Sequence, residues 1–191
     1  MRDVVQASDE DAVTQVPEVI VADRQAIVCQ GLGSLVARIP EVRLGAFAND
    51  KASLRKALRG AAQALVETLD MPEARIDGAM VAHGFRKGVF GRRDPGPDSP
   101  AVMRRLVAAL ISEGAGLLAE GHVKRPSDID ALAVHGLGYP RRQGGPCRVA
   151  QTMGLLALRN DMRTWSEDNL IWEPPEMLDE AVKLAAGFDA L

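Results

Sequence analysis

The stretch "RPSDIDALAVHGLGYPRRQGGP", residues 125–146, combines a helix start, a helix end and a restricted loop. Ser127 follows a proline and is a typical residue for capping the N-terminus of a helix. The short apolar turn after it ends at Gly136 and Gly138, because glycine readily leaves the helical conformation. Tyr139-Pro140 then fixes the direction in which the chain leaves. The stretch therefore predicts a short helix followed by a loop that carries two arginines.

The same order of residues occurs upstream in "PEARIDGAMVAHGFRKG", residues 72–88. Both segments contain a proline, an acidic residue, Ile-Asp, a short apolar turn, His-Gly, an aromatic residue, basic residues and a glycine. They are about 53 residues apart, a period typical of repeated structural units. We therefore predict two copies of one helical unit, over about 60–91 and 101–152, that pack against each other.

The clearest helix is predicted over residues 101–121, which end at a glycine. Leu106, Leu110 and Leu117 lie on one apolar stripe at helical spacing. A single helix with one apolar stripe is marginally stable alone, so we expect these leucines in the core of a bundle. Other helices are expected over 50–69, 72–85, 126–136 and 173–187.

The N-terminal third has a different pattern. Residues 18–23 and 41–48 are rich in β-branched residues and are expected to be strands, with a helix over 24–39 between them. The predicted fold is therefore mainly α, with a short N-terminal β-α-β-α segment followed by a helical bundle. The expected organisation is a flexible leader over 1–16, the β-α-β-α segment over 17–59 and the bundle over 60–191.

The composition excludes several classes of protein. A net charge of −3 gives no electrostatic argument for nucleic acid. No apolar run approaches the length of a membrane span, which is about 20 residues, and the acidic N-terminus is not a signal peptide. Cys29 and Cys147 have no partners at metal-ligand spacing. We therefore expect a cytoplasmic protein with no metal site and no contact with membranes.

The segment "LISEGAGLLAEGHVKRPSDIDALAVHGLGYPRRQGGP" resembles the C-terminal helical domain of the 3-hydroxyacyl-CoA dehydrogenases. The similarity is greatest to the second helical repeat of the multifunctional fatty-acid β-oxidation enzymes. The family motifs are present here as Ser112-Glu113-Gly114, Arg125 to Asp130, Gly136 to Pro140 and Gly144 to Pro146. The resemblance covers residues 101–190 closely and 60–91 less closely. It implies a bundle that closes an acyl-CoA cleft and supplies packing or dimer surface.

In that family, a separate domain binds NAD, which exchanges a hydride with the 3-hydroxyacyl-CoA. Its G-x-G-x-x-G turn is absent here, because Gly31-x-Gly33 has no third glycine and lies inside a predicted helix. We expect no cofactor in this chain, with NAD present only where a separate domain supplies it. His83 and His135 are interpreted as helix-end histidines bonded to backbone. No catalytic residue is predicted, and the chain alone is expected to be inactive.

Three residues of the Gly/Pro loop are the candidate substrate-binding residues: Tyr139, Arg141 and Arg142. A guanidinium pairs well with phosphate oxygens, so the arginines are candidates to contact a phosphate of acyl-CoA. The alternative is a solvated or helix-capping pair. Cys147, next to the loop, is interpreted as a small core residue. The expected partners are acyl-CoA and either a second copy of the chain or an NAD-domain chain.

Residues 18–72 also resemble half of a degenerate response-regulator receiver. Receivers hold Mg²⁺ with an acidic pair and a phospho-accepting aspartate before Met-Pro. The corresponding positions here are Asp23-Arg24 and Thr68, so such a site would be inactive. The alternative function is therefore a receiver-like regulatory protein. Residues 19–32 can instead be compared with the dehydrogenase strand-and-helix junction, with Gln30 in place of asparagine.

Overall fold

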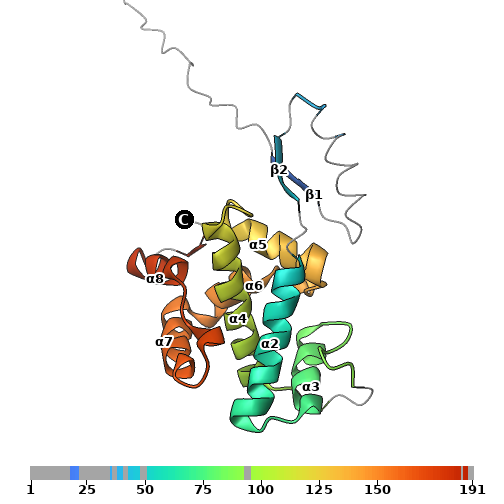
Figure 1. Ribbon diagram of the computed structural model, residues 1–191, viewed down its shortest axis with the longest axis vertical. Coiled ribbons are helices and arrows are strands. Elements are labelled where there is room, and N and C mark those ends of the chain that lie inside the picture. Colours follow the sequence, from blue (N-terminus) through green and yellow to red (C-terminus); the bar gives the residue numbers. More distant parts are fainter. Residues whose placement is uncertain are drawn as a thin grey trace, which may run out of the picture.

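The computed structural model describes residues 18–21, 35, 38–40, 43–47, 51–92, 96–185 and 187–188. Most of these residues are helical, which confirms the prediction of a mainly α fold (Figure 1). The elements in chain order are β1 (Glu18–Val21), β2 (Arg43–Phe47), α2 (Lys51–Leu69), α3 (Glu73–His83), α4 (Pro100–Ala119), α5 (Pro126–Leu132), the π-helix η1 (Ala133–Leu137), the 3₁₀ helix η2 (Arg141–Gln143), α6 (Pro146–Met153), α7 (Leu155–Ser166), the 3₁₀ helix η3 (Leu170–Trp172) and α8 (Glu176–Lys183).

The N-terminal part does not support the predicted β-α-β-α unit over 17–59. β1 and β2 form a parallel pair with an irregularity between Val19 and Ile20, but most of the helix expected over 24–39 lies outside the described residues. Two parallel strands of this length are too small to form a core. The helix after them, α2, runs without a break through residue 60, so both of its halves join the helical bundle.

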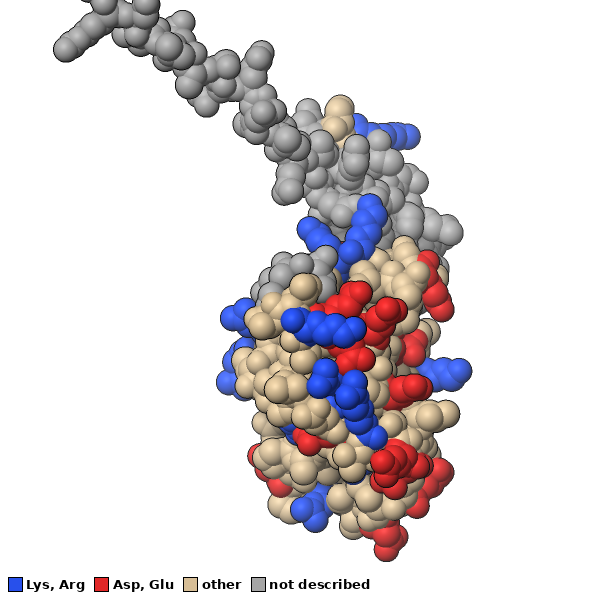
Figure 2. All heavy atoms as spheres, turned by 90° about the vertical axis from the view of Figure 1, so that its left-hand side faces the viewer, with Lys and Arg blue, Asp and Glu red and all other residues tan. Residues whose placement is uncertain are grey.

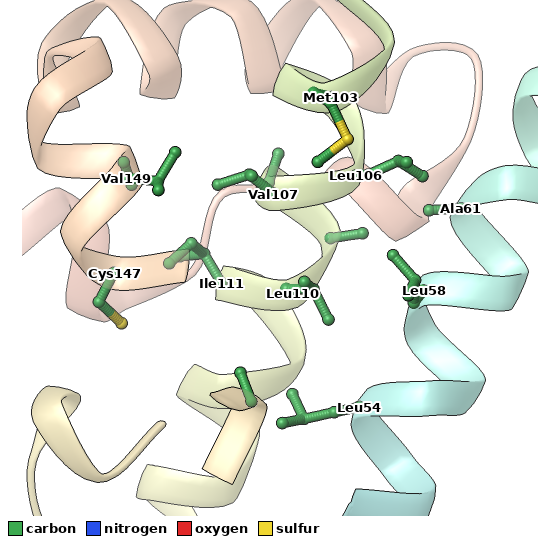
Figure 3. Packing of buried hydrophobic residues seen from close by; sticks show 14 of the residues in the cluster. Leu54, Leu58, Ala61, Met103, Leu106, Val107, Leu110, Ile111, Cys147 and Val149 are labelled. Atoms are coloured by element: carbon green, nitrogen blue, oxygen red, sulfur yellow. The ribbon is translucent and has the colours of Figure 1, made fainter. Parts of the chain in front are cut away.

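Helix α4 is the centre of the bundle and lies between α2 and α6 (Figures 1 and 3). In Figure 3, Leu54 and Leu58 of α2 point toward Leu106 and Leu110 of α4. All four side chains are at most 3% exposed. The opposite side of α4 contacts α6, where Cys147 is buried as predicted.

The leucine stripe predicted on α4 is confirmed. Leu106 and Leu110 are fully buried and Leu117 is 5% exposed. Burying one such side chain stabilises the fold by about 1.5–3 kcal/mol. Because α4 also contacts α3, α5 and α7, its burial holds both halves of the bundle together.

The start of α5 differs from the prediction. Ser127, expected to cap the helix, lies inside its first turn, and the N-cap is Arg125. The Asp128 carboxylate accepts hydrogen bonds from the backbone N–H groups of Lys124 (3.1 Å) and Arg125 (3.0 Å). A carboxylate at the third helical position can reach back to these free N–H groups, and here it replaces the serine as the capping group.

Candidate functional site

The candidate site is built on two loops that follow α3 and η1. Each begins at a glycine with positive φ after a helix: Gly84 at 115° and Gly138 at 83°. These φ values are readily available only to glycine, so the sequence positions at which both loops begin are fixed. We call residues 84–92 the first loop and residues 138–148 the second loop.

The first loop is held by the buried carboxylate of Asp77 on α3. Its two oxygens accept hydrogen bonds from the backbone N–H of Phe90 (3.0 Å) and of Arg92 (2.7 Å). The loop passes so close to Asp77 that a Cβ at Gly88 would lie 2.0 Å from its Oδ1 atom. Only glycine fits at position 88 without a shift of Asp77.

The second loop is held in the same way by Asp130 on α5. The Asp130 oxygens accept from the backbone N–H of Cys147 (2.7 Å) and of Arg148 (3.1 Å). A Cβ at Gly145 would lie 2.4 Å from the Asp130 carboxylate, and the φ of Gly145 is 124°. The aspartates of the two shared Ile-Asp pairs therefore have the same role: each holds the loop that follows its helix.

The two units differ by one residue. Phe85 follows Asp77 by eight positions, whereas Tyr139 follows Asp130 by nine. The π-helix η1 accommodates the additional residue, since a π-turn holds one more residue than an α-turn. The backbone N–H of Phe85 bonds to Met80 O and that of Tyr139 to Ala133 O, both at 3.0 Å.

The loops meet at these two aromatic residues. The Phe85 and Tyr139 rings are 5.2 Å apart in an edge-to-face arrangement. The Tyr139 hydroxyl is 2.9 Å from Nε2 of His83, and Gln143 Nε2 donates to the His83 carbonyl oxygen at 3.1 Å. The expectation that backbone satisfies the His83 side chain is wrong, because its partner is the hydroxyl of the other unit. His135 is exposed in η1.

Burial controls the titration of this pair. It raises the pKa of the Tyr139 hydroxyl far above its ordinary value, with smaller contributions from Asp130 and Cys147. Burial also lowers the pKa of His83 below its ordinary value of 6.5, and Asp98 opposes that shift. Both groups are therefore neutral at pH 7.

The three candidate substrate-binding residues have different surroundings. Tyr139 is only 2% exposed, so its side chain supports the loop from inside. Arg141 and Arg142 lie in η2 and are exposed, and neither forms an ion pair within the described residues. The structure thus presents the two arginines to solvent and buries the tyrosine.

The Ser112-Glu113-Gly114 motif on α4 has packing roles. The Ser112 hydroxyl donates to the carbonyl oxygen of Glu173 at 2.9 Å and so joins α4 to the end of η3. A Cβ at Gly114 would lie 2.5 Å from Cγ2 of Ile129, so glycine lets α5 approach α4 closely.

Sequence reasoning missed the role of Arg105. Its guanidinium lies over the rings of Trp165 and Trp172, 4.5 and 4.7 Å from their centroids. Trp172 Nε1 donates to the Arg105 carbonyl oxygen at 3.1 Å. Nothing in the sequence around the tryptophans indicates a contact with a residue some 60 positions away, so only the structure reveals it.

Two clefts lie away from the loops. A cleft of about 410 Å³ is lined by Leu155, Leu156, Ala181 and Val182 of α7 and α8, together with neighbouring residues. A second, of about 490 Å³, lies between α2, α4 and η3. Neither is lined by a residue of the two loops.

Charges of both signs are mixed on the face formed by α7 and α8 (Figure 2). On these helices Asp179 pairs with Arg159 (3.4 Å) and Arg163 (3.2 Å), and Asp161 pairs with Arg104 of α4 (2.7 Å). In the described part of the chain, no group of three or more His, Cys, Asp or Glu side chains is placed to hold a metal ion. No described helix has the length and hydropathy needed to cross a membrane.

The geometry defines an all-helical domain with two related helix-and-loop units. Residues 102–187 match the family model described as 3-hydroxyacyl-CoA dehydrogenase, C-terminal domain. This match confirms the resemblance predicted from the sequence.

Similar proteins agree with this match. The chain is 33% identical over 85 residues to the peroxisomal bifunctional enzyme of Homo sapiens, covering 44% of the chain and 12% of that protein. It is 32% identical over 104 residues to the fatty acid oxidation complex subunit alpha of Shewanella baltica (strain OS185), covering 53% and 15%. The chain thus spans only a small part of the length of the relatives it matches.

Nothing in these matches favours the receiver alternative. Thr68, compared above with a phospho-accepting residue, lies in the last turn of α2, where its hydroxyl donates to the Ala64 carbonyl oxygen at 2.7 Å. Asp23, Arg24, Gln30 and the Gly31-x-Gly33 sequence lie outside the described residues.

Proposed function

We propose that this chain is the acyl-CoA-binding helical part of a 3-hydroxyacyl-CoA dehydrogenase of fatty-acid β-oxidation and that another domain or chain carries NAD. The observation that supports this proposal is the family match over 102–187, which includes the complete second loop. Its named relatives are much longer than this chain, as expected for a part that works beside other domains.

In this proposal, the second loop binds the CoA end of the substrate. Arg141 and Arg142 are exposed on a short 3₁₀ helix between Pro140 and Gly144. Guanidinium groups pair with phosphate oxygens through two parallel hydrogen bonds. Tyr139 acts from below, because its buried hydroxyl fixes the base of the loop on His83. A loop fixed in this way loses little entropy when it binds.

In this proposal, the domain or chain that carries NAD performs the hydride transfer. NAD supplies the acceptor for the hydride when it is bound, and the proposal assigns no residue of this chain to it. The family's catalytic His–Glu pair belongs to the NAD-binding domain, so the chain alone is expected to have no dehydrogenase activity.

Calorimetric titration tests the proposal. Acetoacetyl-CoA should bind the purified chain, whereas NADH should give no heat, and the chain alone should not oxidise NADH with acetoacetyl-CoA present. Absence of acetoacetyl-CoA binding would contradict the proposed function. Binding of NADH in the micromolar range would contradict the assignment of NAD to a separate domain.

The oligomeric state and location are further parts of the proposal. We expect a homodimer or a complex with an NAD-domain chain, which sedimentation of the chain alone and of the mixture distinguishes. Fractionation of cells tests the proposed cytoplasmic location.

A further inference from the structure

Both loops, and not only the second, carry an exposed pair of basic residues. Arg86 and Lys87 follow Phe85 in the first loop, and Arg141 and Arg142 follow Tyr139 and Pro140 in the second. All four side chains are exposed. The aromatic residue before each pair is buried, at 7% exposure for Phe85 and 2% for Tyr139.

The two basic pairs occupy related positions in their loops. Asp77 and Asp130 fix the ends of their loops through matching pairs of backbone hydrogen bonds. The contact between the Phe85 and Tyr139 rings fixes the beginnings of the loops. Each basic pair therefore follows closely after one of the two rings in contact.

The loops are also close to each other beyond the rings. A Cβ at Gly84 would contact Pro140 at 3.1 Å and the Nη2 atom of Arg142 at 4.0 Å. Gln143 is bonded to the backbone of His83, the residue before Gly84. The guanidinium of Arg142 consequently lies over the start of the first loop, two residues before Arg86.

The charges of these four side chains are available for a ligand. Within the described residues none of the four forms an ion pair, in contrast to Arg92 at the end of the first loop, which pairs with Glu73. The nearby carboxylates of Asp77 and Asp130 accept hydrogen bonds from backbone N–H groups of the loops, and that of Asp98 acts on His83.

We propose that Arg86, Lys87, Arg141 and Arg142 form one anion site across both helix-and-loop units, for a ligand with two separated phosphate groups. The 3′-phosphorylated ADP end of CoA has this chemistry: a diphosphate and a 3′-phosphate separated by a ribose. Arginine suits paired phosphate oxygens, whereas lysine acts as a point charge on one phosphate. The inference rests on the proposed function and extends it by assigning the first loop to the same ligand.

The experiment compares two double variants with a matched control. R86A/K87A removes the first pair, R141A/R142A removes the second, and R55A/R59A removes two exposed charges from α2, which belongs to neither loop. Circular dichroism checks that each variant is folded. Calorimetry then measures binding of acetoacetyl-CoA, CoA and 3′-dephospho-CoA at low and at moderate salt.

Each loop variant should weaken CoA binding about tenfold, and added salt should weaken binding by the parent. The parent should also prefer CoA to 3′-dephospho-CoA, and one of the loop variants should lose that preference. The control should bind like the parent.

Unchanged binding in R86A/K87A beside weaker binding in R141A/R142A would overturn the two-loop site and leave the proposed function intact. Equal weakening by R55A/R59A would also overturn the site, because the effect would then be one of net charge. A parent that binds no CoA compound would overturn both proposals.

Discussion

The two helix-and-loop units reach the same arrangement by different local routes. In the first, α3 is a regular helix that ends at Gly84 before Phe85. In the second, α5 continues into the π-helix η1, which ends at Gly138 before Tyr139. A π-turn absorbs the additional residue, so the aspartate and the aromatic residue remain in equivalent places. The geometry around the aspartate and the aromatic ring is thus retained although the helix between them differs.

The chemistry at the centre also differs between the units. Phe85 contributes only a ring, whereas Tyr139 adds a hydroxyl that bonds His83 of the first unit. The hydrogen bond makes the contact between the units directional. A hydrophobic contact alone would allow the two loops to shift against each other.

The largest effect is expected where both units depend on the same helix. Leu110→Ala on α4 should lower the free energy of unfolding by about 2–5 kcal/mol, because Leu110 is fully buried and leaves a cavity. Urea denaturation measures the change. Leu170→Ala, at a side chain that is 74% exposed, is the control and should have little effect. A near-zero change for Leu110→Ala would contradict the burial of this side chain in the core of the bundle.

A smaller effect is expected from the aspartates that hold the loops, and it should differ between them. Asp77→Ala should cost about 2–3 kcal/mol and Asp130→Ala about 1–2 kcal/mol, since each leaves two backbone N–H groups without an acceptor. Asp77 is fully buried, whereas water reaches Asp130 and can replace part of its hydrogen bonding. Parallel urea denaturation of both variants checks the order. A greater loss for Asp130→Ala would contradict the comparison.

The hydroxyl of Tyr139 is expected to contribute less. Tyr139→Phe makes the second unit resemble the first and should cost about 0.5–1.5 kcal/mol through the lost hydrogen bond to His83. A double-mutant cycle with His83→Ala isolates the interaction. Strict additivity of the two changes would mean that the hydrogen bond does not link the units in solution.

The smallest effect concerns pH. Burial lowers the pKa of His83 in the folded chain, so between that pKa and 6.5 the unfolded chain binds more protons. Stability should therefore fall as the pH drops below about 6.5, the ordinary pKa of histidine, and level off below the folded-state pKa. Denaturation midpoints at several pH values between 7.5 and 4.5 test this. His83→Gln should lose this component, and an unchanged pH profile would contradict the assignment.

Much of this architecture was predictable from the sequence because it depends on local rules. Helical spacing of Leu106, Leu110 and Leu117 identified the buried stripe of α4. Gly84 and Gly138 marked where the helices end, since a positive φ is difficult for other residues. Gly136, also expected to end a helix, lies inside η1 instead. The repeated Ile-Asp and His-Gly pattern indicated two units, and the motifs around them indicated the family resemblance that the match over 102–187 confirms.

The tertiary structure alone decided how distant residues meet. Ser127 was predicted to cap α5, but the helix begins earlier, with Arg125 as its N-cap, and the Asp128 carboxylate accepts the backbone hydrogen bond there. The histidine of one unit and the tyrosine of the other are 56 positions apart, and no local pattern specifies their hydrogen bond. The same holds for Arg105 between its two tryptophans. Short-range preferences act through the backbone of a few neighbouring residues, whereas these partners are chosen by how the helices pack.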